Sequence, residues 1–526
     1  MKVLVCDDLS ERGLTILEDE PGIDVDVKLQ LSEVELCETI SPYDAVIVRS
    51  STKITASVIE SARQLKVIGR AGIGVDNIDL DAATKRGIIV MNTPEGNVVT
   101  TAEHTFALII ALAKSIPQAN LSVKERKWER ELFIGSELFG KTLGIIGLGR
   151  IGQLVAKRAQ GFEMVTIAYD PYISAEIAKK MGVELVSFED LLKRSDYISI
   201  HAPKTKETLH LIGEKELAMM KDGVRIINCA RGGLLDEIAL YRALVKGNVA
   251  GAALDVYEEE PPFISPIVEL DSVICTPHLG ASTGEARDNV SIAVAEQLID
   301  YFKHGRIRNA VNVISVDIEL LPKLEPYLKL GEKLGAFLAQ WIEGGIREVT
   351  VKYSGEVINL GVKPITVSVL KGLLQIFLED RVNVVNAPIL AKERGITVTE
   401  ATTSETEDYA SLIRVEMKTD KGVGVICGTL FGMKEQRIVR IQDYHVEAVP
   451  SGFMLVFSNL DTPGVIGKIG TLLGNEQINI AGMQLGRVSP GGEAVAMVNV
   501  DSPIPPEVLE KIRALPNIFR AKLVVL

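Results

Sequence analysis

The sequence predicts an α/β protein with two doubly wound parallel sheets, followed by two smaller α+β units. Three observations carry this prediction. Short β-branched runs alternate with helical patterns as far as His304, a glycine cluster lies at residues 147–152, and the pattern changes after Asn312. Buried parallel strands joined by helices give runs rich in Val and Ile, as seen here.

Composition limits the classes of function that the chain can have. The 526 residues favour several domains, and 47% apolar with 24% charged residues is ordinary for a globular protein. A net charge of −13 argues against non-specific nucleic-acid binding. The five scattered cysteines form no C-x-x-C pair, so we expect no metal and a reducing cytoplasm. We read no signal peptide and no apolar run of membrane length, so no membrane partner is expected.

The first unit has four short β-branched runs separated by helical patterns, which predicts a doubly wound sheet of flavodoxin-like type. The runs are Val3–Cys6, Ala45–Val48, Lys66–Gly69 and Ile88–Met91. Two long amphipathic patterns, at residues 97–116 and 284–304, would cross between this unit and the next. We therefore expect a discontinuous substrate-binding domain, made of residues 1–96 and 284–311.

The glycine cluster has the form G-x-G-x-x-G, at Gly147, Gly149 and Gly152. A strand-like run precedes it, a helical pattern follows, and a second strand ends in Asp170, which together form a dinucleotide-binding signature. Gly147 permits a tight turn, Gly149 lets a pyrophosphate approach the helix N-terminus, and Gly152 lets helix and strand pack closely. Asp170 would bind both ribose hydroxyls and repel a 2′-phosphate. We expect a Rossmann domain over residues 97–283 with NAD as cofactor.

The tail after Asn312 divides into two units. Residues 312–450 begin with a helical stretch and continue as a Val-, Ile- and Thr-rich region, which we interpret as an intervening α+β domain without a chemical motif. Residues 451–526 follow a β-α-β-β-α-β order, which predicts a ferredoxin-like domain. A helix is expected to start within Asp461–Gly467, with Pro463 near its first turn.

Three segments at the ends of expected strands carry candidate catalytic groups. They are Asn228–Gly233, Asp255–Pro262 and Thr276–Ser282. Ligands of open α/β sheets bind at the carboxyl ends of the strands. A nicotinamide dehydrogenase of hydroxy acids needs a cation for the carboxylate, a proton acceptor, and a group that holds the acceptor. His104, His201, His210, His304 and His445 compete with His278 for the acceptor role.

These segments, with the glycine loop and Asp170, resemble the D-isomer-specific 2-hydroxyacid dehydrogenase family. The resemblance implies that His278 takes the hydroxyl proton, Glu260 orients it and favours its imidazolium form, and Arg231 binds the carboxylate and carbonyl oxygen bidentately. Cys229 has no nearby base, so we interpret it as a wall residue. The cofactor-binding residues implied are Gly147, Gly149, Arg150, Ile151, Gly152, Asp170, Cys229, Ala230, Asp255, His278, Gly280 and Ala281.

The first unit supplies further arginines at strand ends. Arg49 and Arg70 add cationic donors that a phosphorylated substrate needs and lactate or glyoxylate does not. The resemblance adds Asn97 as a substrate contact and suggests that Arg130 reaches the site of a neighbouring subunit. The implied substrate is 3-phospho-D-glycerate, oxidised with NAD to 3-phosphohydroxypyruvate. The substrate-binding residues implied are Arg49, Arg70, Gly72, Asn97, Arg130, Arg231 and His278.

The last unit resembles an ACT domain, a regulatory module that binds amino acids at a paired interface. The resemblance implies L-serine as an inhibiting effector and a homo-oligomer, expected to be a tetramer. The small sheet is expected to bury itself against a copy. A dimerisation module without ligand is the alternative. The residues implied for serine are Asn459, Asp461, Gly464 and Asn479.

Two other functions remain open at this point. One is a glyoxylate or hydroxypyruvate reductase of the same family, against which the extra arginines and the long tail argue. The other is an NAD-sensing binding protein on the same fold, which would be expected to lack such a tail. The arginine, glutamate and histidine set does not separate an enzyme from a binding protein, since a binding protein could retain it.

Overall fold

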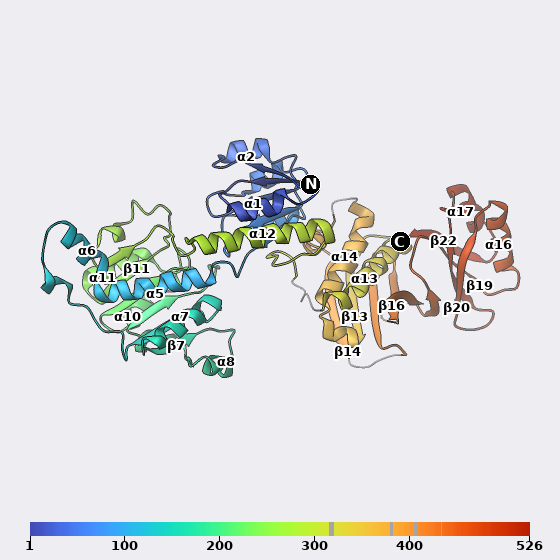
Figure 1. Cartoon of the computed structure of the whole chain (residues 1–526). Helices are drawn as coiled ribbons and strands as arrows, with labels where there is room; N and C mark the ends of the chain where they lie inside the picture. The colour runs from blue at the N-terminus through green and yellow to red at the C-terminus, as the bar shows by residue number, and fades with distance from the viewer. Residues whose placement is uncertain (315–319, 379–381, 404–407, 433) are drawn as a thin grey trace.

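The computed structural model describes residues 1–314, 320–378, 382–403, 408–432 and 434–526. Four sheets account for the named strands of these residues. Figure 1 shows the seven-stranded sheet on the left, the N-terminal sheet above the long helix in the middle, and the two later sheets on the right. The order of units expected from the sequence is confirmed.

The N-terminal sheet has five parallel strands in the order β2-β1-β3-β4-β5, the flavodoxin-like order. The sequence prediction missed β2. The strands are β1 (Lys2–Val5), β2 (Asp24–Val27), β3 (Ala45–Val48), β4 (Val67–Arg70) and β5 (Ile89–Asn92). The helices between them are α1 (Glu11–Glu18), α2 (Glu33–Thr39), α3 (Ala56–Ser61) and α4 (Leu80–Lys85).

Helix α12 (Gly284–His304) lies directly beneath this sheet, although more than 190 residues separate it from β5 (Figure 1). It approaches α1 so closely that a Cβ on Gly13 would lie 2.6 Å from the Cβ of Ser291. Ser291 Oγ accepts a hydrogen bond of 3.0 Å from the backbone N–H of Ser10. Val294 and Leu298 are fully buried with residues of β1, β3 and β4. The chain therefore returns to its first unit, as expected.

The second sheet has seven parallel strands in the order β12-β11-β10-β9-β6-β7-β8, which contains the Rossmann order. Its short edge strand β8 was not expected. The strands are β6 (Thr142–Ile146), β7 (Val165–Tyr169), β8 (Glu184–Leu185), β9 (Tyr197–Ile200), β10 (Val224–Asn228), β11 (Val249–Leu254) and β12 (Val273–Cys275).

Helices cover this second sheet and also connect it to the first. They are α5 (Val98–Lys114), α6 (Ile116–Lys124), α7 (Arg150–Gly161), α8 (Ala175–Lys180), α9 (Phe188–Arg194), α10 (Glu214–Met219) and α11 (Glu237–Lys246), with 3₁₀ turns η1 (Arg130–Phe133) and η2 (Pro266–Glu269). Among the described residues, no single helix has both the length and the apolarity to cross a membrane. One bent pair, α5 with α6, meets that test jointly, with a 64° break between them.

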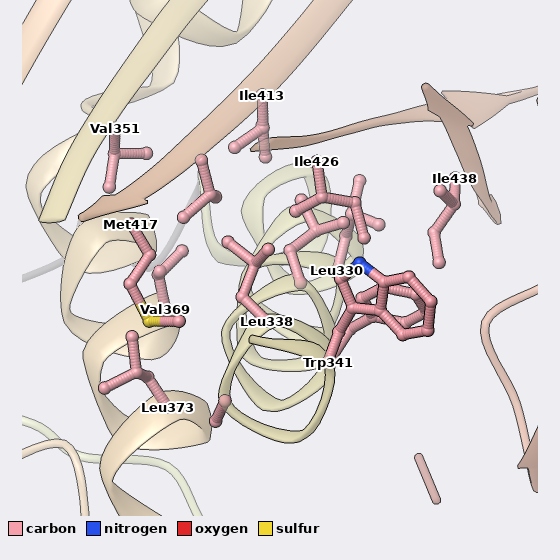
Figure 2. Packing of buried hydrophobic residues seen from close by; sticks show 14 of the residues in the cluster. Leu330, Leu338, Trp341, Val351, Val369, Leu373, Ile413, Met417, Ile426 and Ile438 are labelled. Carbon is pink, nitrogen blue, oxygen red and sulfur yellow. The ribbon is translucent and has the colours of Figure 1, made fainter. Parts of the chain in front are cut away.

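The intervening unit is a six-stranded sheet in the order β14-β13-β15-β16-β17-β18, antiparallel except for the β13–β14 pair. Figure 2 shows Leu330, Leu338 and Trp341 of helix α13 (Leu321–Trp341) packed against the sheet residues Ile413 and Ile426. The other elements are β13 (Ile346–Gly355), η3 (Glu356–Leu360), α14 (Lys363–Leu378), α15 (Ala387–Glu393), β14 (Thr397–Thr403), β15 (Ser411–Thr419), β16 (Val423–Phe431), β17 (Glu435–Ile441) and β18 (Tyr444–Ala448).

The last unit has the ferredoxin-like order β20-β21-β19-β22, which confirms the expected arrangement. Its elements are β19 (Phe453–Leu460), α16 (Val465–Asn475), β20 (Ile480–Arg487), β21 (Glu493–Val500), α17 (Pro506–Arg513) and β22 (Ile518–Val525). Helix α16 begins one residue after Gly464, which is its N-cap with a φ of +90°. Pro463 therefore immediately precedes the N-cap and lies near the first turn of the helix, as expected.

Residues on both faces of this small sheet pack within the chain, although β20 leaves side chains such as Leu485 exposed. Leu455 and Phe457 pack with α16 and α17, while Met454, Val456 and Met497 belong to the core of the intervening unit. The side chain of Gln340, near the end of α13, exchanges two hydrogen bonds of 2.9 and 3.0 Å with the backbone of Val525. The expectation that the sheet buries itself against a copy is wrong for these faces, because α13 covers one of them.

Candidate active site

The predicted catalytic residues lie at the carboxyl ends of strands in the two parallel sheets. Arg70 ends β4, and Arg49 follows β3 directly. Arg231, Glu260 and His278 lie in the segments that follow β10, β11 and β12. The edges where ligands bind in open α/β sheets therefore carry these side chains.

The glycine loop between β6 and α7 has the geometry that a dinucleotide requires. Gly147 has a φ of +93°, and a Cβ there would lie 2.7 Å from the carbonyl oxygen of His201. A Cβ on Gly152 would overlap the carbonyl oxygen of Gly147, whereas one on Gly149 would meet no described atom within 4 Å. Free space thus faces the helix N-terminus at Gly149, where a pyrophosphate would lie.

Asp170 follows β7 and stabilises the turn of the glycine loop. Its carboxylate accepts hydrogen bonds of 2.8 Å from the backbone N–H groups of Leu148 and Tyr172. A carboxylate has room for about four hydrogen bonds, so two acceptor positions are left for ribose hydroxyls. The residues present therefore fit a dinucleotide with an unmodified 2′-hydroxyl.

His278 and Glu260 form a pair, with 2.9 Å between Nδ1 and Oε2. The carboxylate can only accept, so Nδ1 carries the proton and Nε2 remains available. The other oxygen of Glu260 accepts a bond of 3.2 Å from the backbone of Tyr257. Burial alone would raise the pKa of Glu260, but the hydrogen bond and charge of His278, with the Tyr257 N–H, bring it below its ordinary value.

The backbone of His278 is in the left-handed region, with a φ of +55°. A non-glycine residue persists there only where its surroundings enforce it. The fully buried Asp255 provides that restraint, because its carboxylate accepts bonds of 2.7 and 2.8 Å from the N–H groups of Leu279 and Gly280. Its backbone carbonyl also accepts from the His278 N–H at 2.9 Å. A direct contact of Asp255 with the cofactor remains a prediction.

Burial would raise the pKa of Asp255, but hydrogen bonds lower it below its ordinary value. The donors are His104, with 3.2 Å between Nε2 and Oδ1, then Thr276 and Leu279. His104, on α5, therefore supports the loop that carries His278. Sequence reasoning had named His104 only as a competitor for the proton-accepting role.

The structure contains a second histidine–glutamate pair near the first. His210 Nε2 lies 3.2 Å from Oε1 of Glu258, and this backbone is also left-handed, with a φ of +51°. Side-chain exposure is the same in both pairs, 44% for histidine and 40% for glutamate. The pairs differ in their supports, because the His278 loop is fixed by Asp255 and follows β12 at the sheet edge. Geometry alone makes His210 the natural control for His278.

The substrate side of the site is a cluster of guanidinium groups. Cβ atoms on Gly72 and Gly74 would overlap the guanidiniums of Arg70 and Arg231, so these two glycines leave room for them. Burial, followed by the charges of Arg231 and Arg49, lowers the pKa of Arg70 to about 10. Arg70 Nε is buried without a hydrogen-bond partner. Mutual repulsion and an unpaired donor favour the binding of an anion here.

Arg231 has a partner that sequence reasoning missed. Its Nε donates a hydrogen bond of 2.7 Å to Oδ2 of Asp76, and its Nη1 donates one of 2.6 Å to the carbonyl of Ala230. Asp76 lies in the loop after β4, so this ion pair joins the first sheet unit to the second. The segment was visible in the sequence, but its acid was assigned no role.

The remaining predicted residues differ in their surroundings. Asn97 is buried and its side-chain oxygen has no hydrogen-bond partner. Cys229 is buried, and desolvation raises its pKa to about 12, which supports a wall residue and not a nucleophile. Arg150 pairs with Glu95 at 3.3 Å. Arg130 lies exposed in η1 and makes no ion pair with a described residue.

The residues predicted for serine are not brought together within one chain. Asn459 pairs with Ala494 at one end of β21, and Asn479 precedes Ile480, which pairs with Val500 at the other end. Six residues of strand separate these positions by about 20 Å. Asp461 accepts a hydrogen bond of 2.7 Å from Arg487, which holds its pKa below the ordinary value. Gly464 is open on its Cβ side.

Comparison with known proteins gives three family matches along the chain. Residues 106–280 match the NAD-binding domain of D-isomer-specific 2-hydroxyacid dehydrogenases. Residues 323–442 match the D-3-phosphoglycerate dehydrogenase intervening domain, and residues 453–517 match the ACT domain. The fold and the matches define an NAD-dependent dehydrogenase of 2-hydroxy acids.

Similar proteins extend this assignment over the full length. D-3-phosphoglycerate dehydrogenase of Archaeoglobus fulgidus is 47% identical over 100% of both chains. The enzymes of that name from Methanocaldococcus jannaschii and Bacillus subtilis are 48% and 42% identical, over 98% and 99% of both chains. The chain belongs to the D-3-phosphoglycerate dehydrogenase family.

Two similar solved structures each cover a little more than half of this chain. D-lactate dehydrogenase from Aquifex aeolicus, in complex with NAD and lactic acid, is 32% identical with a TM-score of 0.53, over 58% of this chain and 96% of that one. A glyoxylate reductase from Paecilomyes thermophila is 31% identical with a TM-score of 0.55, over 59% and 98%. Each leaves about two fifths of this chain uncovered, so the full-length relatives carry the finer distinction.

Proposed function

We propose that the chain oxidises 3-phospho-D-glycerate to 3-phosphohydroxypyruvate with NAD, the first step of L-serine synthesis. The observation that carries this proposal is the cluster of Arg49, Arg70 and Arg231, because Arg231 follows β10 and the His278–Glu260 pair follows the adjacent strands β12 and β11. Several guanidiniums suit a substrate that has both a carboxylate and a phosphate. The names of the full-length relatives support the same substrate.

The chemistry follows from the positions of three side chains. Bound NAD, held by the Gly147–Gly152 loop and Asp170, supplies the hydride acceptor. Glu260 fixes Nδ1–H of His278, so Nε2 takes the proton of the substrate hydroxyl. The hydrogens of Arg231 Nη1 and Nη2 that are not engaged with Ala230 bind the carboxylate and the C2 oxygen, while Nε is held by Asp76. Asp255 keeps the His278 loop in place while the proton moves.

The other site residues have roles that follow from their surroundings. Arg49 and Arg70 hold the phosphate, with Gly72 leaving room for the Arg70 guanidinium. Asn97 is buried and its side-chain oxygen has no partner, and we propose that its amide contacts the substrate. We also propose contacts with the cofactor for Arg150, Ile151, Cys229, Ala230, Asp255, His278, Gly280 and Ala281.

Glyoxylate reductase is the second candidate, since one similar solved structure has that name. The arginine cluster and the tail argue against it, because glyoxylate has neither a phosphate nor a need for an amino-acid sensor. The experiment measures NADH oxidation with phosphohydroxypyruvate and then with glyoxylate. A kcat/KM at least about 100-fold higher for phosphohydroxypyruvate supports the proposal. A preference for glyoxylate overturns it in favour of the second candidate, and no turnover with either leaves an NAD-binding protein.

We infer a homo-oligomer, expected to be a tetramer, in the cytoplasm. The segment from α6 to residue 139 exposes large apolar side chains, a pattern that marks protein interfaces. They are Ile116, Leu121, Val123, Trp128, Leu132, Ile134 and Phe139. Arg130 lies among them, so pairing through this surface would bring it to a neighbouring subunit. Light scattering of the purified chain tests the assembly, and a monomer would overturn it.

L-serine is proposed as the effector of the ACT unit. Asn459 is buried with an unpartnered side-chain oxygen, and Asn479 lies about 20 Å away along the strand direction. A serine molecule cannot touch both in one chain, so the site requires a second copy. Inhibition follows only if serine binds two conformations unequally.

A further inference from the structure

We propose that Asp76 is a positioning residue for Arg231. It lies in the first sheet unit and binds the guanidinium of Arg231 in the second, so that only one edge of the guanidinium faces substrate. This inference rests on the proposed function, in which Arg231 binds the substrate carboxylate. Asp76 belongs to the Ala71–Asn77 loop after β4, and Arg231 belongs to the segment after β10. Their ion pair of 2.7 Å therefore connects two sheets that share no strand.

The guanidinium of Arg231 has little orientational freedom. Asp76 accepts from Nε, and the carbonyl of Ala230 accepts from Nη1. Nη2 lies against Gly74, so closely that any side chain there would overlap it. Two hydrogen bonds and this close approach of Gly74 thus restrain the group. The donors that remain are hydrogens on Nη1 and Nη2, which is the edge suited to a bidentate carboxylate contact.

The loop that carries Asp76 is itself fixed by hydrogen bonds, so the carboxylate of Asp76 has a fixed position. The side-chain amide of Asn77, the next residue, donates hydrogen bonds of 2.7 and 2.6 Å to the carbonyls of Arg49 and Thr52. The neighbouring Thr52 and Arg49 in turn donate from their backbones to the buried Asp7 at 3.2 and 2.5 Å. Asp76 is thus a fixed acid on a fixed loop.

The charge of Asp76 has a second effect on the same cluster. Arg70 and Arg231 repel each other, and Asp76 and Asp7 are the acids that offset this repulsion at Arg70. Without Asp76, Arg231 would still attract an anion but would rotate away from Arg70. Loss of Asp76 is therefore expected to reduce the rate of hydride transfer more than the attraction of substrate, because misorientation acts on the transition state.

The test is a double-mutant cycle on the full chain. Asp76→Asn removes the negative charge and keeps the size of the side chain. Arg231→Lys keeps the positive charge but removes the planar guanidinium that can bind a carboxylate through two nitrogens. In the wild-type background, Asp76→Asn should lower kcat for phosphohydroxypyruvate reduction roughly 10- to 100-fold. KM should change less than kcat, and the Kd of NADH should stay within about twofold. In the Arg231→Lys background the same substitution should have little further effect, since residues that act through one another are non-additive.

Controls separate this inference from a structural effect and from the proposed function. Asp81→Asn changes another exposed aspartate of the same unit, in the first turn of α4, and should leave kcat unchanged. Asp76→Glu restores the charge and should recover part of the lost rate. Additive effects of Asp76→Asn and Arg231→Lys would overturn the positioning role and leave the proposed function intact. If Arg231→Lys alone had no effect on kcat/KM, that result would refute the proposed binding of substrate by Arg231.

Discussion

Glu260 Oε2 lies 2.9 Å from Nδ1 of His278, and the backbone of His278 is held in a left-handed conformation by the buried Asp255. The pair therefore offers a single free imidazole nitrogen, Nε2, from a rigid loop. A base that is fixed in this way needs no reorganisation when the substrate arrives.

His278→Ala should lower kcat by far more than tenfold, because general acid–base catalysis typically contributes about 10²–10⁴-fold. NADH binding, followed by fluorescence titration, should be nearly unchanged. His210→Ala is a matched control, since His210 has the same exposure, a left-handed backbone and a glutamate partner. Loss of turnover in His210→Ala with retention in His278→Ala would reverse the assignment.

Glu260→Gln should lower kcat and remove the loss of oxidation rate that accompanies protonation of Glu260 at low pH. The lowered pKa of Glu260 means that its charge is present above the ordinary glutamate range and is lost only as pH falls through the lower folded value. The carboxylate therefore stays charged beside His278 throughout the working range, whereas the amide of Glu260→Gln is neutral at every pH. Glu258→Gln, in the second pair, should leave the profile in place; a shift in that variant alone would contradict the pairing.

Gly149→Ala and Gly152→Ala should fail in different ways. A Cβ on Gly149 meets no described atom within 4 Å, so Tm should be nearly unchanged while NADH binds at least about tenfold more weakly, roughly 1.4 kcal/mol. A Cβ on Gly152 overlaps the Gly147 carbonyl, so this variant should lose about 1–3 kcal/mol of folding stability. Thermal unfolding and NADH titration measure both. Unchanged NADH affinity in Gly149→Ala would place the pyrophosphate elsewhere.

Arg70→Gln should raise KM for phosphohydroxypyruvate by about 50- to 100-fold, because truncating a partly buried charge that pairs with a ligand costs roughly 2–3 kcal/mol. Turnover of glyoxylate, if measurable, should change little. Arg63→Gln is the control, since Arg63 is an exposed arginine of the same sheet unit. Equal losses for both substrates would assign Arg70 to the carboxylate and not to the phosphate.

Serine response should be restored by mixing two defective chains. Asn459→Ala and Asn479→Ala each remove one side of a site whose halves lie at opposite ends of β21. Co-expressed chains form mixed pairs with one intact site, so steady-state assays with millimolar serine should show partial inhibition, while each variant alone shows little. Full inhibition in either single variant would remove that residue from the site.

The sequence was sufficient for the parallel sheets, because buried strands such as Ala45–Val48 have continuous apolar runs. The catalytic set of Arg231, Glu260 and His278 stays a prediction. The edge strands β2 and β8 were missed. Asp24–Val27 alternates acid and valine, and β8 has only two residues, so neither has the signal of a buried strand. Apolar periodicity reports burial, and edge strands are only half buried.

Pairings between distant segments could not be predicted. Asp76 and Arg231 are 155 residues apart, and no local pattern in either segment identifies the other residue as its partner. The cover that α13 provides for the last sheet was also invisible, because Met454 and Val456 read equally well as a face for a second copy. Side-chain partners across units depend on tertiary placement, which local pattern does not encode.

Helix α12 supplies Val294 and Leu298 to the core of the N-terminal sheet, yet it is synthesised only after the whole of the second sheet. While the ribosome makes the intervening residues, the face of β1, β3 and β4 that α12 will cover stays bare. The nascent chain therefore carries an unfinished first unit, which cannot complete its core before residue 304 emerges. Until then this face exposes apolar side chains, a state in which nascent chains are prone to aggregate.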